Sequence, residues 1–306
     1  MPSVLIADCD HDTLDPERSV LDPAGVDLRL GGGGDADVLV VQYGRVDAAL
    51  LDAMPSCHAV VRYGVGVDTI DVEAATARGI WVVNVPDYGT EEVADHAVAL
   101  ALALLRGVVF LDRSVRAGTW DDGAAGELRR LSELCLGVVG SGRIGSAVAE
   151  RAAAHGLRVL GHDERPDAVR PPAEPASLDA LLAAADVVSL HAPLVPATRH
   201  LIDAAALDCM RPGAYLVNTA RGGLVDAAAV LDALERGRLA GVALDVFEHE
   251  PPDGAERELA SHPRAIVTPH AAWRSRESEL ALKTEVAREA LRVIEGMRPR
   301  SPVNEP

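Results

Sequence analysis

The chain has 306 residues, of which 48% are hydrophobic and only 3% aromatic, so it is long enough for two domains with cores of aliphatic side chains. A formal net charge of −18 argues against nucleic acid or an anionic membrane surface as a partner. The four cysteines lie far apart in the sequence and lack the spacing of metal ligands. The N-terminus does not resemble a signal peptide. The longest apolar run, residues 97–105, is too short to span a membrane. We therefore expect a cytoplasmic protein with reduced thiols, no membrane partner and no metal site.

Alternating strands and helices fill the first 90 residues, and this alternation indicates a parallel sheet. A glycine run at Gly31–Gly34 is not followed by a helical pattern, so we interpret it as a flexible connection and not as a phosphate-binding loop. The predicted strands are residues 3–7, 38–42, 59–62 and 80–84, and the predicted helix is residues 72–78.

A long buried helix is predicted to begin near Thr90, which is a plausible N-cap followed by two glutamates in the first turn. The helix is apolar around much of its surface as far as Leu105, and we interpret it as the connector between two domains. Residues 108–131 form a mixed segment that leads into the next strand.

The strongest signal in the sequence is a strand–turn–helix–strand unit with three glycines in the spacing G-x-G-x-x-G. Gly140 permits a tight turn, Gly142 lets the backbone approach a pyrophosphate, and Gly145 lets the helix pack closely on the strand. The free N–H groups at the helix N-terminus favour a phosphate. The unit therefore predicts dinucleotide binding, with strands at residues 136–139 and 157–160 and a helix at residues 144–154.

Asp163, which ends the second strand of this unit, favours NAD over NADP because a carboxylate accepts hydrogen bonds from the ribose hydroxyls and repels a 2′-phosphate. Arg165 lies close to it in the sequence and weakens this preference. The serine in the turn does not form the G-x-S-x-G motif of hydrolases, because Val139 and Arg143 occupy the positions where that motif needs glycines.

Polar residues follow the ends of the later strands. Ligands of an open parallel sheet bind beyond the carboxyl ends of its strands. By this rule His191, the loop Thr219–Gly222, Asp245 and His270 converge with the turn at Gly140. The predicted strands are residues 187–190, 214–218, 241–244 and 265–268, and the predicted helices are residues 178–185, 227–236 and 276–295.

Several segments carry a family resemblance, among them NTARGGLVD (218–226), ALDVFEHEP (243–251) and TPHAAW (268–273). Together with VRYGVGVDTID (61–71) and NVPDYGTEEVADHAVAL (84–100), they resemble the D-isomer-specific 2-hydroxyacid dehydrogenases over nearly the whole chain. Within that family, the phosphoglycerate dehydrogenase and C-terminal-binding-protein branch looks closest.

The resemblance implies a catalytic set of Arg221, Glu250 and His270. His270 would be the general acid or base, and Glu250 would pair with it and orient its ring. Arg221 would bind the carboxylate and carbonyl oxygens of the substrate through its planar guanidinium, which a lysine does not imitate. From the residues alone, Glu248 remains a rival for the role of Glu250, because both lie in one acidic turn.

The resemblance also implies contacts to NAD. Asp245 would face the nicotinamide amide, and Thr90 would lie near the cofactor. The position of His191 is compatible both with a contact to the cofactor ribose and with a hydrogen bond to the backbone. The implied cofactor-binding residues are Thr90, Gly140, Gly142, Arg143, Ile144, Gly145, Asp163, His191, Pro193, Thr198, Thr219, Ala220, Asp245 and His270.

The substrate site implied by the resemblance includes a loop after the strand at residues 59–62. The backbone N–H groups of Val65 and Gly66 would bind the substrate carboxylate, and Trp273 is either a wall for the substrate side chain or a core residue. We further hypothesise that Arg45 and Arg62 hold a second anionic group, such as a phosphate. The implied substrate-binding residues are Arg62, Tyr63, Gly64, Val65, Gly66, Arg221 and Trp273.

The sequence thus predicts an α/β protein with two Rossmann-like or flavodoxin-like domains and parallel sheets. An NAD-binding domain, residues 96–275, would be inserted into a substrate domain, residues 1–95 plus 276–306. The function expected is NAD-dependent interconversion of a D-2-hydroxy acid and its 2-keto acid, by a homodimer joined near residues 97–130. The alternatives on the same fold are an NAD(H)-sensing co-regulator of the C-terminal-binding-protein type and a phosphite- or formate-type dehydrogenase.

Overall fold

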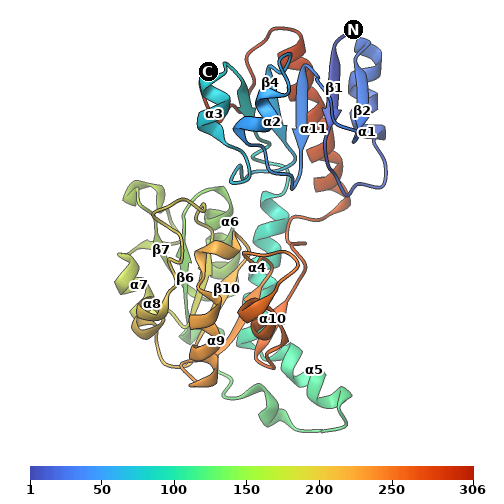
Figure 1. Cartoon of the computed structure of the whole chain (residues 1–306). Helices are drawn as coiled ribbons and strands as arrows, with labels where there is room; N and C mark the ends of the chain where they lie inside the picture. The colour runs from blue at the N-terminus through green and yellow to red at the C-terminus, as the bar shows by residue number, and fades with distance from the viewer. The chain divides into compact units, whose positions relative to one another are not determined.

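The computed structural model describes all residues from 1 to 306 and divides them into two compact units (Figure 1). Unit 1 contains residues 1–89 and 274–306, and unit 2, residues 90–273, is inserted between these two segments of the sequence. Each unit is built on a parallel sheet, which confirms the predicted fold class.

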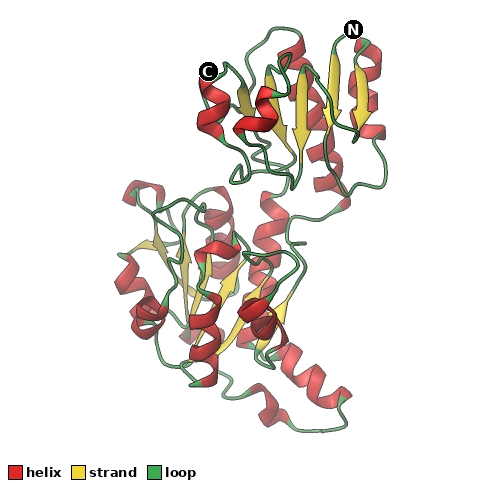
Figure 2. Cartoon of the chain, in the orientation of Figure 1, coloured by secondary structure: helices red, strands yellow, loops and turns green.

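The core of unit 1 is a sheet of five parallel strands, β1 (Ser3–Ile6), β2 (Asp27–Leu30), β3 (Val38–Val41), β4 (Ala59–Arg62) and β5 (Trp81–Val83). Their order is β2-β1-β3-β4-β5, the flavodoxin-like arrangement. All four residues of β3 are buried, as expected for a central strand covered by helices on both faces. Figure 2 shows these helices in red around the yellow strands.

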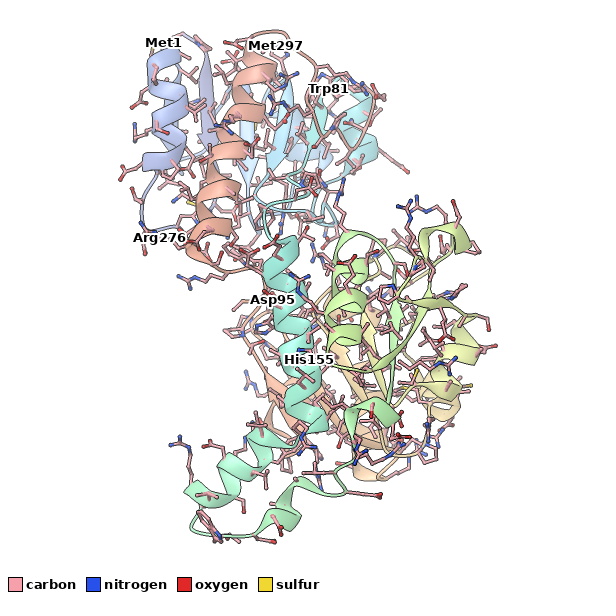
Figure 3. All side chains as sticks on the ribbon, turned by 180° about the vertical axis from the view of Figure 1, so that it is seen from behind. Met1, Trp81, Asp95, His155, Arg276 and Met297 are labelled. Carbon is pink, nitrogen blue, oxygen red and sulfur yellow. The ribbon has the colours of Figure 1, made fainter.

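Four helices cover this sheet, namely α1 (Asp15–Leu21), α2 (Ala48–Asp52), α3 (Val72–Ala77) and α11 (Arg276–Ile294). Helix α1 packs against α11, which also contacts β3 and β4, and α2 packs against α3. In Figure 3, α11 lies in front of the unit 1 sheet, with Arg276 and Met297 labelled near its two ends. The C-terminal segment of the chain thereby completes the core of its N-terminal unit.

The core of unit 2 is a sheet of seven parallel strands, β6 (Cys135–Val139), β7 (Arg158–His162), β8 (Glu174–Pro175), β9 (Val187–Leu190), β10 (Ala214–Asn218), β11 (Leu239–Leu244) and β12 (Ala265–Val267). Their order, β12-β11-β10-β9-β6-β7-β8, is doubly wound, and the winding reverses between β6 and β9. Ligands of such sheets bind beyond the carboxyl ends of the strands at this reversal. The turn after β6 and the residue after β9 meet there, since the N–H of His191 donates to the carbonyl of Val139 at 2.7 Å.

Unit 2 contains seven helices. Helices α4 and α6 lie side by side and carry the labels Asp95 and His155 in Figure 3. Helix α5 projects away from the sheet (Figure 1). The helices are α4 (Thr90–Leu105), α5 (Val108–Arg116), α6 (Arg143–Ala154), α7 (Leu178–Ala184), α8 (Ala204–Cys209), α9 (Ala227–Glu235) and α10 (Gly254–Ser261).

No individual helix has the combination of length and apolar composition that crossing a membrane requires, although α4 and α5 pass such a test together as a pair bent by 62°.

Candidate active site and cofactor-binding turn

The turn between β6 and α6 contains three glycines, and the fold of the turn requires two of them. Gly140 has a φ of 95°, and an added Cβ there would lie 2.6 Å from the backbone nitrogen of Ala192. At Gly145 an added Cβ would lie 1.9 Å from the carbonyl oxygen of Gly140, so a side chain would push α6 off the turn. Nothing lies within 4 Å of an added Cβ at Gly142, and no side chain caps α6. An uncapped helix N-terminus beside open space suits an anion.

Asp163 follows β7 and joins it to this turn. One of its carboxylate oxygens accepts a hydrogen bond from the N–H of Ser141 at 2.9 Å, and the other accepts one from the N–H of Arg165 at 3.0 Å. The Asp163 side chain is 15% exposed, so it keeps an accessible edge beside the turn. The guanidinium of Arg165 lies 3.8 Å from the carboxylate, and its effect on the preference for NAD stays a prediction.

Three buried hydroxyl groups of unit 2 lack a hydrogen-bond partner, namely those of Thr90, Ser141 and Thr219. Leaving a buried hydroxyl unpaired costs about 1–3 kcal/mol, so such groups indicate a site where a ligand completes the bonding. The resemblance implies cofactor contacts for Thr90 and Thr219, and Ser141 lies in the glycine-rich turn. These hydroxyls, the uncapped α6 and the open space at Gly142 all fit a dinucleotide.

His191 follows β9, and its Nε2 lies 2.8 Å from the hydroxyl of Ser189. Burial lowers the pKa of His191 to about 4, so the ring is neutral at pH 7. The hydroxyl of Thr198 donates to the carbonyl of Pro193 at 2.6 Å and accepts from the N–H of Val195 at 2.9 Å. The Thr198 side chain thus closes the loop after β9, and contacts of His191, Pro193 and Thr198 with a cofactor stay predictions.

His270 and Glu250 are in direct contact. Nδ1 of His270 lies 2.7 Å from Oε2 of Glu250, and Oε1 of Glu250 accepts a hydrogen bond from the N–H of Phe247 at 3.0 Å. Burial raises the pKa of Glu250, but the hydrogen bond and charge of His270, the Phe247 N–H and the Arg221 charge outweigh it and hold this pKa below its ordinary value. Glu250 is therefore a carboxylate at neutral pH, and the contact leaves Nε2 of His270 for another partner.

Glu248, the rival of Glu250, has different partners. Its carboxylate forms an ion pair with Arg199 and lies 3.2 Å from Nε2 of His200. The structure therefore pairs Glu250, and not Glu248, with the His270 ring.

Arg221 lies in the loop that follows β10, and the buried Asn218 shapes this loop. The side-chain amide of Asn218 donates to the carbonyl of Arg221 at 2.8 Å, and its Oδ1 accepts from the N–H of Ala220 at 3.0 Å. The guanidinium of Arg221 in turn donates to the carbonyl of Ala220 at 2.7 Å. Hydrogen bonds thus fix the peptide groups of Ala220 and Arg221 in this loop.

Gly222 allows this loop to touch the loop that carries Glu250. An added Cβ at Gly222 would lie 1.9 Å from the carbonyl carbon of Phe247 and 2.1 Å from the nitrogen of Glu248. The two backbones therefore pack directly on each other, and the loops of Arg221 and Glu250 are fixed relative to one another within unit 2.

Asp245, at the end of β11, braces the segment that carries His270. The Asp245 side chain is buried; its Oδ1 accepts from the N–H of Ala271 at 2.9 Å and from the hydroxyl of Thr268, and its Oδ2 accepts from the N–H of Ala272 at 2.9 Å. His270 has a φ of 52°, a conformation that side chains rarely adopt, and its N–H donates to the Asp245 carbonyl at 2.7 Å. Sequence reasoning placed Asp245 at this strand end but missed the brace, and its contact with a nicotinamide amide stays a prediction.

The side chain of Tyr63 points into the core of unit 1. It is 2% exposed, its hydroxyl donates to the buried carboxylate of Glu17 at 2.8 Å, and its ring packs edge-on against His11 with the centroids 4.9 Å apart. The expectation that this side chain lines a substrate pocket is therefore wrong. A buried phenol needs a hydrogen-bond partner, and Glu17 provides it inside the unit.

The loop after β4 contains backbone N–H groups that form no hydrogen bond within the protein. The carbonyl of Val65 accepts from the side-chain amide of Asn84 at 2.6 Å, whereas the N–H groups of Val65 and Gly66 donate to no group of the protein. The guanidinium of Arg62 lies against Gly64, where an added Cβ would be 1.5 Å from Arg62 Nη1. The loop thus combines two open N–H groups with a nearby positive charge.

The remaining predicted residues of unit 2 lie at loop or helix-end positions. Arg143 and Ile144 begin α6, Ala220 follows β10, and Trp273 is half-buried at the end of the unit. Their ligand contacts stay predictions.

The doubly wound sheet and the glycine-rich turn define unit 2 as a dinucleotide-binding domain. Residues 98–272 match the family model described as D-isomer specific 2-hydroxyacid dehydrogenase, NAD binding domain. The chain therefore belongs to the D-isomer-specific 2-hydroxyacid dehydrogenase family, and both the predicted family and the NAD cofactor are confirmed.

Individual relatives carry different substrate names. The chain is 42% identical over 266 residues to a D-3-phosphoglycerate dehydrogenase of Mycobacterium tuberculosis, covering 85% of this chain and 50% of the relative. It is 39% identical over 267 residues to a glyoxylate reductase of Thermofilum pendens, covering 85% of this chain and 78% of the relative. It resembles the structure of a D-lactate dehydrogenase from Aquifex aeolicus complexed with NAD and lactic acid, with a TM-score of 0.86, 30% identity and 96% of each chain covered. The chain spans about half the length of the D-3-phosphoglycerate dehydrogenases that it matches.

Proposed function

We propose that the protein is an NAD-dependent oxidoreductase that interconverts a D-2-hydroxy acid and its 2-keto acid. The observation that carries this proposal is the 2.7 Å contact between Nδ1 of His270 and Glu250, in the same unit as the NAD-binding fold. A carboxylate that holds one imidazole nitrogen leaves the other nitrogen for proton transfer. The packing of the Arg221 loop against the Glu250 loop adds a group whose planar fork suits a carboxylate.

In the proposed mechanism each of these side chains has one task. The turn at Gly140 and the carboxylate of Asp163 would hold NAD, which would supply the hydride donor or acceptor for C2 of the substrate. Arg221 binds the carboxylate and carbonyl oxygens of the substrate and so orients C2. In the direction of reduction, Nε2 of His270 donates a proton to the carbonyl oxygen, and in the direction of oxidation it removes the proton of the hydroxyl group. Glu250 orients the imidazole through Nδ1 and stabilises its protonated form.

A comparison of wild type with His270→Asn and Glu250→Gln tests this mechanism. We expect kcat/KM for a 2-keto acid to fall by at least about 1000-fold in His270→Asn and by about 10–100-fold in Glu250→Gln. The dissociation constant of NADH should stay within about threefold, because neither side chain forms the turn at Gly140. An NAD(H)-sensing co-regulator would instead bind NADH without turnover in the wild type.

For the substrate, we propose a 2-hydroxy acid with a second anionic group, held by Arg45 and Arg62. The exposed guanidinium of Arg45 has no hydrogen bond or ion pair in the structure, and the guanidinium of Arg62 lies against Gly64, which precedes the open N–H groups of Val65 and Gly66 in the same loop. The name of the mycobacterial relatives, D-3-phosphoglycerate dehydrogenase, is consistent with this class. Arg45→Ala should lower kcat/KM for a phosphorylated 2-keto acid at least about tenfold more than for glyoxylate. An equal loss for both substrates contradicts this proposal.

We also propose that the protein is a homodimer joined through the segment near residues 97–130. Four large apolar side chains of this segment are open to solvent, namely those of Val108, Val115, Trp120 and Leu128, and Trp120 is 91% exposed. Exposed apolar side chains that gather on one projecting element favour a protein partner. Trp120→Asp should shift the molecular mass in analytical ultracentrifugation towards that of a monomer, and a monomeric wild type contradicts the proposal.

A further inference from the structure

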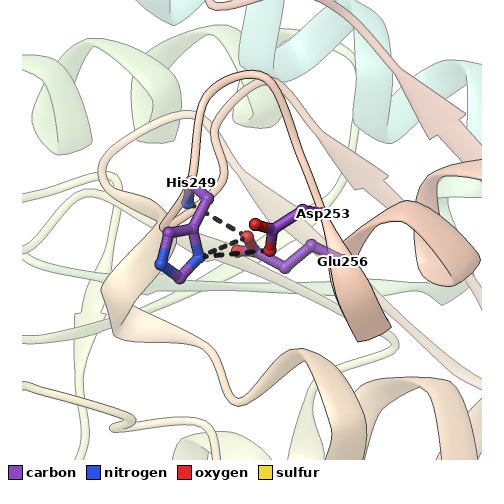
Figure 4. A group of neighbouring side chains, drawn as sticks. All are labelled: His249, Asp253 and Glu256. Carbon is purple, nitrogen blue, oxygen red and sulfur yellow. Dashed lines mark hydrogen bonds and ion pairs between the residues drawn. The ribbon is translucent and has the colours of Figure 1, made fainter.

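A buried carboxylate in the first turn of α10 holds the loop that carries Glu250. Glu256 is 8% exposed. Its Oε1 accepts a hydrogen bond from the N–H of Glu248 at 2.6 Å. Its Oε2 accepts from the N–H of His249 at 3.0 Å and lies 3.1 Å from Nδ1 of the same residue, as Figure 4 shows. A charged acceptor makes these hydrogen bonds stronger than those between neutral groups.

The same side chains resemble a metal-ligand group, because atoms of His249, Asp253 and Glu256 lie within 4.8 Å of one another. Backbone N–H donors nevertheless point at both oxygens of Glu256, and a cation would be repelled by these donors. The side chains of His249 and Asp253 are 64% and 70% exposed. The hydrogen bonds account for this arrangement, and we assign no metal to it.

The two N–H groups bound by Glu256 belong to the residues that immediately precede Glu250. Fixing the peptide planes of Glu248 and His249 restricts the direction in which Glu250 leaves the backbone. The opposite side of this loop is fixed by its contact with Gly222 and by the ion pair of Glu248 with Arg199. Glu256 is the side chain that accepts from the N–H groups of residues 248 and 249, so its loss loosens the segment that presents a carboxylate to His270.

We propose that Glu256 is a positioning residue, which sets the geometry of the Glu250–His270 pair by holding the backbone of residues 248 and 249. Its consequence for turnover rests on the proposed function, whereas its effect on the His270 ring does not. The charged groups that face Glu250 are His270 and Arg221, and those that face Glu256 are His249 and Asp253. Loss of the hydrogen bonds from Glu256 therefore lets the Glu250 carboxylate move away from the His270 ring. No group that touches the ring is removed.

The first experiment follows the imidazole resonances of His270 by NMR as a function of pH in the full chain. We expect Glu256→Gln to move the titration midpoint of His270 to lower pH by about 0.3–1 unit, in the direction of Glu250→Gln, because a misplaced carboxylate supports the imidazolium less. Glu258→Gln is the matched control, since it makes the same charge change on an exposed position of the same helix and should leave the midpoint unchanged. The side chain of Glu256→Asp keeps the charge but is too short to reach both N–H groups, so it should give an intermediate shift of the His270 midpoint. This variant replaces Glu256→Gln in the experiment if Glu256→Gln does not fold.

The second experiment measures turnover of the same variants. In Glu256→Gln we expect kcat/KM for the 2-keto acid to fall by about 10–100-fold while the dissociation constant of NADH stays within about twofold. An unchanged His270 titration in folded Glu256→Gln and Glu256→Asp, with only the melting temperature lowered, overturns the proposal. A shifted titration in a protein whose wild type reduces no 2-keto acid would uphold the positioning role and contradict the proposed function.

Discussion

Replacing Gly222 by alanine perturbs the contact between the loops of Arg221 and Glu250. The added Cβ would lie 1.9 Å from the carbonyl carbon of Phe247 and 2.1 Å from the nitrogen of Glu248. Non-bonded carbon atoms rest at about 3.5 Å, so the loops must separate by about 1.5 Å. Both neighbours are backbone atoms, and no change of rotamer relieves the clash. Since a displacement of about 1 Å in a catalytic arrangement can cost about 100-fold in rate, we expect kcat/KM to fall at least that far, which equals about 2.7 kcal/mol.

Gly223→Ala is the matched control for this prediction. Its added Cβ would meet the methyl carbons of Leu194 at 3.0 and 3.2 Å, and these side-chain ends can move by the few tenths of an ångström required. Steady-state reduction of a 2-keto acid at saturating NADH should therefore stay within about threefold of wild type. The dissociation constant of NADH, measured in parallel, should be unchanged in both variants. Full activity of Gly222→Ala, or an equal loss of turnover and NADH affinity, would refute the reasoning.

Three further predictions concern burial, the brace and the turn. Burial holds the pKa of His191 at about 4, below the ordinary 6.5, so between these pH values the unfolded chain binds more protons than the folded one. The contribution of this residue to stability is therefore complete above pH 6.5 and is lost as the pH falls towards 4. The loss amounts to at most about 3 kcal/mol. In urea denaturation, the free energy of unfolding should fall less between pH 7 and pH 5 in His191→Gln than in wild type, whereas the exposed control His155→Gln should behave like wild type. An equal fall in wild type and both variants would contradict this. Asp245→Asn turns an amide donor towards backbone N–H groups and should lower the free energy of unfolding by about 1–3 kcal/mol and reduce kcat, and a variant with wild-type stability would show that the brace is dispensable. Gly142→Ala has space for its methyl group and should keep the melting temperature, but it should weaken NADH binding about tenfold in a fluorescence titration; unchanged affinity would place the phosphates elsewhere.

Much of the fold was predictable because buried parallel strands read as continuous apolar runs. The strands Cys135–Val139 and Val187–Leu190 are buried at every position, and their sequences have no alternation. The turn at Gly140 was predictable for a different reason, since close backbone contacts require glycine at Gly140 and Gly145 and the open space at Gly142 suits the approach of a phosphate. Short or polar elements gave no such signal. Strand Asp27–Leu30 contains an Asp and an Arg, and helix Asp15–Leu21 is short with a proline in its first turn.

The errors at the candidate site come from contacts between residues far apart in the chain. Tyr63 follows a strand end, as a ligand-binding residue does, but its partner Glu17 is 46 residues away in the sequence and draws the side chain into the core. Glu256 was not singled out from the sequence, and only the fold shows that its carboxylate is buried against N–H groups of the loop. The choice between Glu248 and Glu250 likewise depended on which carboxylate meets the His270 ring.

The most direct test of the central claim is NADH oxidation by the purified protein against a panel of 2-keto acids, with Arg221→Lys alongside. The panel should contain glyoxylate, hydroxypyruvate, phosphohydroxypyruvate and phenylpyruvate. We predict turnover with a clear preference within the panel, a D-configured product, and a loss of at least about 100-fold in kcat/KM for Arg221→Lys, because an ammonium cannot replace the planar fork. The absence of turnover with every member, while NADH still raises the melting temperature, would contradict the assignment of Arg221, Glu250 and His270 to 2-keto acid reduction.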